Sequence, residues 1–237
     1  MPTNALFQRF YFSKPWYVSG TALFHELIQA GTPKNAEILE IGAGPQNVTS
    51  NFLSSIGRVT GLDIDKSVET NPALTEAHVF DGGRFPFTDN RFTLCVSNYV
   101  LEHVANPDLH FKEVARVLRP GGIYFFRTPN IWHYITIASR FLPHSLHLKL
   151  ANQLRGLKGA HDPYPTVYHA NSRRALEKHA CNAAMRINTL KMIEVEPSYG
   201  AASPLLFFPM MFYERTVNRL SALSAFRVNI LGAVEKS

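Results

Sequence analysis

The sequence predicts an α/β fold with a mostly parallel sheet, and two observations carry this prediction. Apolar strand-like segments alternate with helical patterns, and the first strand stops abruptly at Gly42 and Gly44. Alternation of this kind is typical of parallel sheets, because consecutive parallel strands need a crossover connection. We therefore expect ligands at the carboxyl ends of the strands, where such sheets bind them.

Short apolar runs bounded by turn residues predict the strands, and apolar residues at helical spacing predict the helices. The predicted strands are 36–41, 58–63, 77–80, 92–98, 122–127, 189–195 and 227–234. The predicted helices are 19–30, 107–118 and a third that begins at Asn171 or Ser172 and continues to residue 184.

The bulk composition allows one large hydrophobic core. The chain has 237 residues, 46% of them hydrophobic, and only two cysteines. Cys95 lies inside an apolar strand, so neither a disulfide framework nor a metal site is expected. No run reaches the ~18 apolar residues of a membrane span, so we expect a cytoplasmic protein, with contact at a membrane surface as an open alternative.

The net charge of +6 is unevenly distributed along the chain. Residues 1–130 carry 11 Lys and Arg against 12 Asp and Glu, whereas residues 131–237 carry 13 against 6. Such a basic excess attracts an anionic substrate, a nucleic acid or an acidic lipid surface. Scattered solubilising charge would produce the same numbers.

The glycine turn and Asp63 together predict a nucleoside site. Asp63 follows Gly42 by 21 residues and ends the next strand. Glycines let a ligand approach the backbone, and a carboxylate at the next strand end can accept hydrogen bonds from both ribose hydroxyls. A nicotinamide site would need a third glycine in the pattern G-x-G-x-x-G, and Asn47 stands there instead.

Later segments make the pattern more specific. They are, in order, ILEIGAGP, GLDID, FDGGRFPF, RFTLCVSNYVLEHV and VARVLRPGGIYFF. Over residues 36–130 this order resembles the class I S-adenosylmethionine-dependent methyltransferases. The resemblance implies a Rossmann-like, doubly wound, mostly parallel seven-stranded sheet with an antiparallel last strand and a helical cover. It also implies S-adenosylmethionine as the cofactor.

The resemblance assigns the cofactor's polar groups to acidic side chains at strand ends. It places the ribose at Asp63, the adenine amine at Asp81 with Gly82 beside the ring, and the charged methionine end at Glu40. A helix cap competes with this role for Glu40, and a turn competes with it for Asp81. Asp65 is expected to start the next helix.

The remaining predicted cofactor contacts come from two glycines and an asparagine. Gly42 and Gly44 would leave the space that the ligand needs, and Asn98 would face the methionine portion and the reacting methyl group. Structural capping is the alternative role for Asn98.

A general base is optional, because the cofactor's sulfonium is already activated. If the acceptor is a hydroxyl, the candidate bases are His103, His133 and His169. Structural hydrogen bonding is the alternative for His103.

We expect residues 1–35 to form an N-terminal helical cap and residues 36–237 to form the methyltransferase domain. An insertion at 131–170, with a leucine stripe from Leu146 to Leu157, is expected to cover the active site. The apolar segment 199–214 is interpreted as a lid or core element, or as a partner or membrane contact. Aromatic residues expected to roof the cleft are Tyr11, Phe12, Trp16, Tyr17, Trp132 and Tyr134, and cations suited to an anionic acceptor are Arg155, Lys158, Arg173 and Arg174.

These observations predict transfer of a methyl group to a small-molecule, lipid-linked or glycan acceptor. An RNA methyltransferase is an alternative supported only by basicity, since no stacking-and-basic module is visible. A noncatalytic nucleoside-binding scaffold of the same fold is a third hypothesis. The sequence leaves the oligomeric state open.

Overall fold

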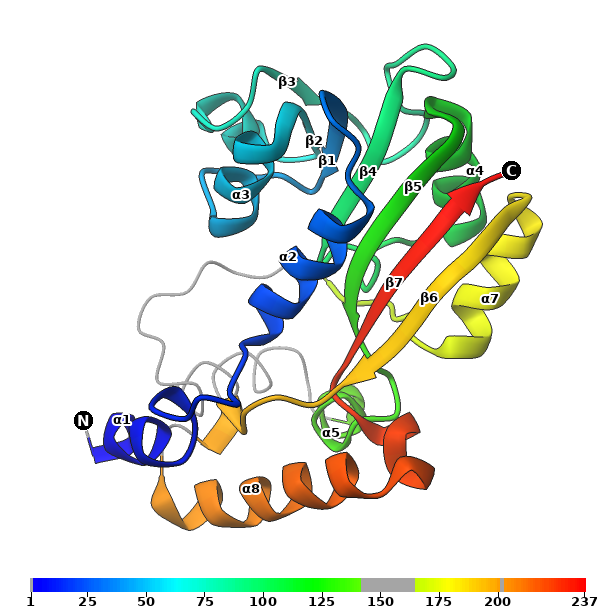
Figure 1. Cartoon of the computed structure of the whole chain (residues 1–237). Helices are drawn as coiled ribbons and strands as arrows, with labels where there is room; N and C mark the ends of the chain where they lie inside the picture. Colours follow the sequence, from blue (N-terminus) through cyan, green and yellow to red (C-terminus); the bar gives the residue numbers. More distant parts are fainter. Residues whose placement is uncertain (1, 142–164, 201–202) are drawn as a thin grey trace. The chain divides into compact units, whose positions relative to one another are not determined.

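The structure is a computed structural model and describes residues 2–141, 165–200 and 203–237 (Figure 1). The leucine stripe Leu146 to Leu157, with Arg155 and Lys158, lies outside the described residues. The chain divides into two compact units, each built from three stretches of sequence. The sheet unit comprises Leu23–Pro129, Thr166–Lys191 and Ile230–Ser237, and the helical unit comprises Met1–Ala22, Asn130–Pro165 and Met192–Asn229.

The described residues form a sheet of seven strands in the order β3-β2-β1-β4-β5-β7-β6. β1 pairs in parallel with both β2 and β4, so that Glu40 lies beside Gly61 on one side and Val96 on the other. β7 is antiparallel, as the opposed arrows of β6 and β7 show in Figure 1, which confirms the predicted fold. The strands are β1 Ala36–Ile41, β2 Gly57–Asp63, β3 Glu76–Val79, β4 Phe92–Asn98, β5 Leu118–Pro129, β6 Met185–Ile193 and β7 Asn229–Lys236.

Helices cover both faces of this sheet, as alternate residues of β5 show. On one face a β-carbon added at Gly31, the last residue of α2 (Gly20–Gly31), would meet the Phe125 ring. On the other face Phe111 of α4 (Pro107–Val117) packs against the rings of Tyr124 and Phe126. Successive strand residues point to opposite faces, so the two helices lie on different sides.

Three helices of the sheet unit are each preceded by a residue whose side chain accepts hydrogen bonds from the first free backbone amides of the helix. Asn47 caps α3 (Val48–Ile56), Asn106 caps α4, and Ser172, one of the two predicted residues, caps α7 (Arg173–Asn182). Asp65 caps the 3₁₀ turn η2 (Lys66–Thr70), which confirms its predicted place at the start of the next helical segment.

The helical unit differs most from the sequence-based picture. Most of the apolar segment 199–214, which contains Pro204 and Pro209, belongs to one continuous helix, α8 (Pro204–Arg219). Pro204 occupies the first turn, where its missing amide hydrogen costs nothing. Around Pro209 the helix is held by tertiary packing, because Phe207 is fully buried against Phe7 and Tyr11.

The other helical elements of this unit are short. They are α1 Pro2–Phe7, η1 Gln8–Phe12, α5 Tyr134–Phe141, η3 Ser198–Gly200 and η4 Ser221–Phe226. None of the helices in the described part of the chain combines the length and apolarity that crossing a bilayer requires.

Candidate functional site

The glycine turn after β1 requires glycine for conformational and steric reasons. Gly42 and Gly44 adopt φ angles of +72° and +51°, which disfavour any residue with a β-carbon. At Gly42 an added β-carbon would also overlap Val100, so the space that the glycine preserves there is filled by protein. The amide of Gly42 donates to the Leu62 carbonyl at 2.7 Å, which ties the turn to the end of β2.

Asp63 lies directly beside this turn. Its Oδ2 accepts a hydrogen bond from the Gly44 amide at 2.8 Å, and its Oδ1 accepts one from the Asp65 amide at 2.8 Å. Both oxygens keep further lone pairs, because a carboxylate has about four acceptor sites. The side chain is half-buried and therefore remains able to accept from a ligand's hydroxyl groups.

Glu40 is a buried carboxylate with an unmatched oxygen. It is 3% exposed, and among the residues that the structure describes none donates a hydrogen bond to its Oε2. Burial raises the pKa of Glu40 to about 7, the hydrogen bond with Ser50 opposes that rise, and the nearby Asp63 charge adds to it. An ammonium group would satisfy such a site. Because Asn47 caps α3, the alternative role of helix cap is not the one Glu40 has.

The N-terminus of α3 is closed to phosphate. Asn47 Oδ1 accepts from the amides of Thr49 at 2.8 Å and Ser50 at 3.0 Å, which are the donors that a phosphate would otherwise use. Asn71 Nδ2 adds hydrogen bonds to Gly44 O and Ser50 Oγ. The turn therefore suits a nucleoside without a pyrophosphate better than a dinucleotide.

Asn98 ends β4 within a polar cluster of its own unit. Its Nδ2 donates to Thr49 Oγ1 at 3.0 Å, and its Oδ1 accepts from Arg127 Nε at 2.7 Å. Arg127 is 6% exposed, and its guanidinium lies 4.5 Å from the ring centroid of Tyr99, whose φ is +59°. The sequence analysis missed Arg127, although a cation in the apolar strand IYFFRTP was the available signal.

Asp81 and Gly82 follow β3 on an exposed turn. Asp81 Oδ1 accepts from the Gly83 amide at 2.9 Å, so the aspartate does shape the turn. Gly82 has a φ of +86°, and an added β-carbon would meet nothing within 4 Å. The second carboxylate oxygen leaves the turn compatible with a ligand contact as well.

The chain segments that carry His103 and His169 are joined by hydrogen bonds within the sheet unit. The amides of Val167 and Tyr168 donate to the Glu102 carbonyl at 2.8 and 3.1 Å, which binds the segment after the undescribed residues to the loop after β4. The exposed His169 ring bonds Ala105 O through Nδ1 at 2.9 Å, and the His103 amide donates to Val100 O at 2.9 Å. Both histidines thus take part in this loop's structure.

Glu102 is a buried acid that the sequence analysis did not single out. It is 4% exposed, and burial raises the pKa of Glu102 to about 7. Thr128 Oγ1 bonds Glu102 Oε2 at 3.2 Å, and Asn171 Nδ2 donates to Thr128 Oγ1 at 2.6 Å. The network joins the ends of β4 and β5 to the residue before the α7 cap.

His133 belongs to the helical unit and is 2% exposed. Its Nε2 lies 3.6 Å from Glu194 Oε2, and Glu194 also accepts from the Val228 amide at 2.7 Å. The rings of Tyr134 and Tyr213 pack around the imidazole. This burial favours a role in packing for His133 over the role of a general base.

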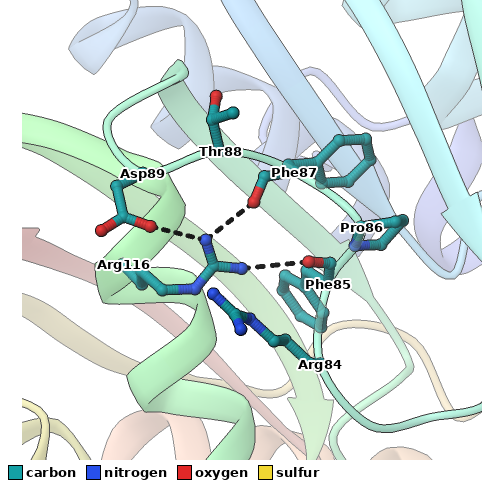
Figure 2. A pocket seen from close by; sticks show the side chains of 7 residues that line it. All are labelled: Arg84, Phe85, Pro86, Phe87, Thr88, Asp89 and Arg116. Atoms are coloured by element: carbon teal, nitrogen blue, oxygen red, sulfur yellow. Dashed lines mark hydrogen bonds and ion pairs between the residues drawn. The ribbon is translucent and has the colours of Figure 1, made fainter.

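A cavity of about 570 Å³ in the sheet unit is lined by Arg116, whose polar groups already bond other lining residues (Figure 2). Arg116 donates to the carbonyls of Phe85 and Phe87 and to the carboxylates of Asp89 and Glu113, which uses all five of its N–H groups. Arg116 stands in the last turn of α4, just before β5 begins. The cavity therefore lies at the amino ends of the strands, away from the glycine turn.

The sheet order and the helices on both faces define a Rossmann-like α/β protein, and comparison with known proteins shows what it is similar to. Residues 39–126 match the family model described as a methyltransferase domain. An uncharacterized methyltransferase from Mycolicibacterium gilvum is 32% identical over 97 residues, which are 38% of each chain. The ubiquinone biosynthesis O-methyltransferase of Agrobacterium fabrum is 31% identical over 90 residues, 38% of this chain and 32% of that protein.

A solved structure extends the likeness to most of the chain. The crystal structure of a SAM-dependent methyltransferase from Methanosarcina mazei superposes with a TM-score of 0.56 at 18% identity, covering 89% of this chain and 96% of the other. The matched region spans less than two fifths of the length of the curated relatives described above. Residues 39–126 are thus similar to a methyltransferase domain, and this match covers less than half of the chain.

Proposed function

We propose that the protein is an S-adenosylmethionine-dependent methyltransferase that acts on a small-molecule, lipid-linked or glycan acceptor. The observation that carries this proposal is the Asp63 carboxylate bonded at 2.8 Å to the Gly44 amide, beside a helix whose N-terminus is closed by Asn47. This arrangement suits a ribose without an attached phosphate. The methyltransferase family of residues 39–126 supports the same cofactor.

The residues of the sheet unit fit that cofactor. Asp63 would accept from the two ribose hydroxyls, and Asp81 would accept from the adenine amine with Gly82 beside the ring. The buried, unmatched oxygen of Glu40 would accept from the methionine ammonium, and the Asn98 amide would orient the methionine end. When bound, the sulfonium supplies an activated methyl group, so the protein's tasks are alignment and exclusion of water.

The acceptor is proposed to be small and at least partly apolar. The relative from Agrobacterium fabrum is named for ubiquinone biosynthesis, and aromatic side chains are abundant in the helical unit. The exposed Arg173 and Arg174 would suit an anionic group on the acceptor. If the acceptor is a hydroxyl, His169 is the most accessible of the three candidate bases.

Cofactor binding tests the proposal directly. Calorimetric titration of the full chain with S-adenosylhomocysteine should show saturable binding. Asp63→Ala should weaken that binding by ~1–3 kcal/mol, because the ribose hydroxyls lose their acceptor. Asp63→Asn, which keeps one carbonyl oxygen, should lose less. Equal affinity of Asp63→Ala and the parent protein would remove the ribose assignment.

The two alternatives make different predictions. An RNA methyltransferase would bind RNA with a steep salt dependence, because phosphate contacts release counterions. A noncatalytic scaffold would bind the nucleoside and transfer no label. Incubation with radiolabelled cofactor and separate lipid, quinone, phenol and glycan extracts should label one acceptor class, and labelling of RNA alone would favour the first alternative.

A further inference from the structure

One face of α8 exposes large apolar side chains. Leu205, Phe208 and Phe212 are 83%, 46% and 73% exposed, and their spacing of three and four residues places them in one stripe. The opposite face of the helix buries Phe207 and Val217. α8 is therefore apolar on both faces, whereas an ordinary surface helix turns its apolar side inward and a polar side outward.

The same stripe carries only positive charge. Arg215 and Arg219 continue it toward the C-terminal end of α8, and both are exposed. Glu214 is the one acid in the helix; it is 3% exposed, accepts a hydrogen bond from the Tyr11 hydroxyl at 2.8 Å and pairs with Arg215 at 3.3 Å, so the net positive charge of this end comes from Arg219. The solvent-facing surface of α8 is thus apolar at one end and cationic at the other.

The N-terminal segment widens this surface. Phe7 packs the N-terminal segment against α8, since the ring centroids of Phe7 and Phe207 lie 5.1 Å apart. Phe12 and Trp16 are 45% and 54% exposed, and Arg215 lies 4.6 Å from the Trp16 ring centroid. Residues 2–22 contain Arg9 and Lys14 and no acid.

We infer that this surface binds the interface of an anionic phospholipid membrane. We call it the interfacial face, and it consists of Arg9, Phe12, Lys14, Trp16, Leu205, Phe208, Phe212, Arg215 and Arg219. A basic amphipathic helix with aromatic and leucine side chains on its outer surface lies in the headgroup region rather than across the bilayer. Tryptophan and arginine suit the boundary between lipid and water.

The charge of the interfacial face and the distribution of exposed apolar side chains favour an anionic membrane over other partners. Eleven of the seventeen large apolar side chains that are exposed in the described residues belong to the helical unit, although it is the smaller unit. A second copy of the chain would bring the same cations against this face, whereas anionic lipid complements them. The inference goes beyond methyl transfer and does not depend on it.

Vesicle sedimentation of the full chain tests the inference. The protein should bind vesicles of phosphatidylcholine mixed with phosphatidylglycerol, bind phosphatidylcholine alone weakly, and lose the difference at high salt. The double variant Leu205→Glu/Phe212→Glu should lower partitioning at least tenfold. The matched control is Leu109→Glu, since Leu109 is an exposed leucine, 38% accessible, on α4 of the sheet unit. It should bind like the parent.

A second pair of double variants tests how much the cations contribute to membrane binding. Arg9→Ser/Arg219→Ser should weaken binding about 30-fold, at about 1 kcal/mol for each cation near the surface. Lys112→Ser/Lys178→Ser removes the same charge from exposed positions of the sheet unit and should have a much smaller effect.

A spectroscopic measurement locates the contact. The chain has two tryptophans, so Trp132→Phe leaves Trp16 as the single reporter, and brominated lipids should quench it. The inference is overturned if Trp16 is not quenched, if the stripe variant and its control bind equally, or if no vesicle binds. It is also overturned if sedimentation velocity shows self-association that Leu205→Glu/Phe212→Glu abolishes.

Discussion

In the sheet unit, polar groups at the strand ends are buried and bonded, whereas in the helical unit large apolar side chains face solvent. Glu40, Glu102 and Arg127 are each at most 6% exposed, and each sits at or just beyond the carboxyl end of a strand. Leu205 and Phe212, in contrast, are more than 70% exposed on the outer side of α8. The first arrangement suits the proposed cofactor, and the second suits the proposed contact with a membrane surface.

The difference has a physical cause in how each unit is stabilised. Backbone hydrogen bonds between parallel strands fix the positions of their side chains. Polar groups at the carboxyl ends of the strands can therefore be held with little freedom. The helical unit is held by a small aromatic cluster of Phe7, Tyr11 and Phe207, which leaves the opposite face of α8 without internal packing. Three pairs of variants test this comparison.

The largest effect is expected in the aromatic cluster. Phe207→Ala should lower the free energy of unfolding of the helical unit by about 3–5 kcal/mol, because it removes a fully buried ring. Phe212→Ala, on the exposed face of the same helix, should change it by less than about 0.5 kcal/mol. Hydrogen exchange should show lost protection in α1 and α8 with the sheet strands unchanged. Equal loss in β1 and β4 would mean that the two units do not unfold separately.

A smaller effect is expected at the glycine turn. Gly42→Ala should cost about 2–4 kcal/mol, because a positive φ is combined with overlap against Val100. Gly121→Ala is the matched control, since its φ is +74° and an added β-carbon would meet nothing within 4 Å. Its cost should be about 1 kcal/mol, from backbone strain alone. Chemical denaturation of the two variants measures the difference, and equal midpoints would contradict the clash.

The smallest effect is a pH dependence at the two buried acids. Burial raises the pKa of Glu40 to about 7, so the folded state holds this proton more tightly than the unfolded state does. The free energy of unfolding should therefore fall as pH rises from about 4.5 to about 7, and Glu40→Gln should remove about 1–3 kcal/mol of that fall. Urea titrations at several pH values provide the measurement.

Glu102→Gln separates stability from ligand binding. Burial raises the pKa of Glu102 to about 7 as well, so this variant should flatten the stability profile in the same pH range. Affinity for S-adenosylhomocysteine should rise with pH through 7 in the parent and in Glu102→Gln, but not in Glu40→Gln. A pH-independent affinity in the parent would refute the ammonium contact of Glu40.

Local patterns predicted much of the sheet unit. The runs 36–41 and 92–98 are strands with those limits, because an apolar run bounded by turn residues has few alternatives. Other limits moved when the sheet formed: β6 begins at Met185 rather than residue 189, because pairing with a neighbouring strand extends a strand beyond its apolar run. The sequence pointed to Asp63 and Glu40 as site candidates but not to Arg127 or Glu102, whose burial and hydrogen bonds depend on distant partners.

Local sequence was enough to predict the α/β class, the glycine turn and the acid beside it, because periodicity and left-handed backbone are properties of neighbouring residues. Three features could be seen only in the folded chain: α8 continues through Pro209, Glu40 has an unmatched oxygen, and α8 also exposes an apolar side to solvent. Each of these depends on contacts between residues far apart in the chain, where burial outweighs local propensity.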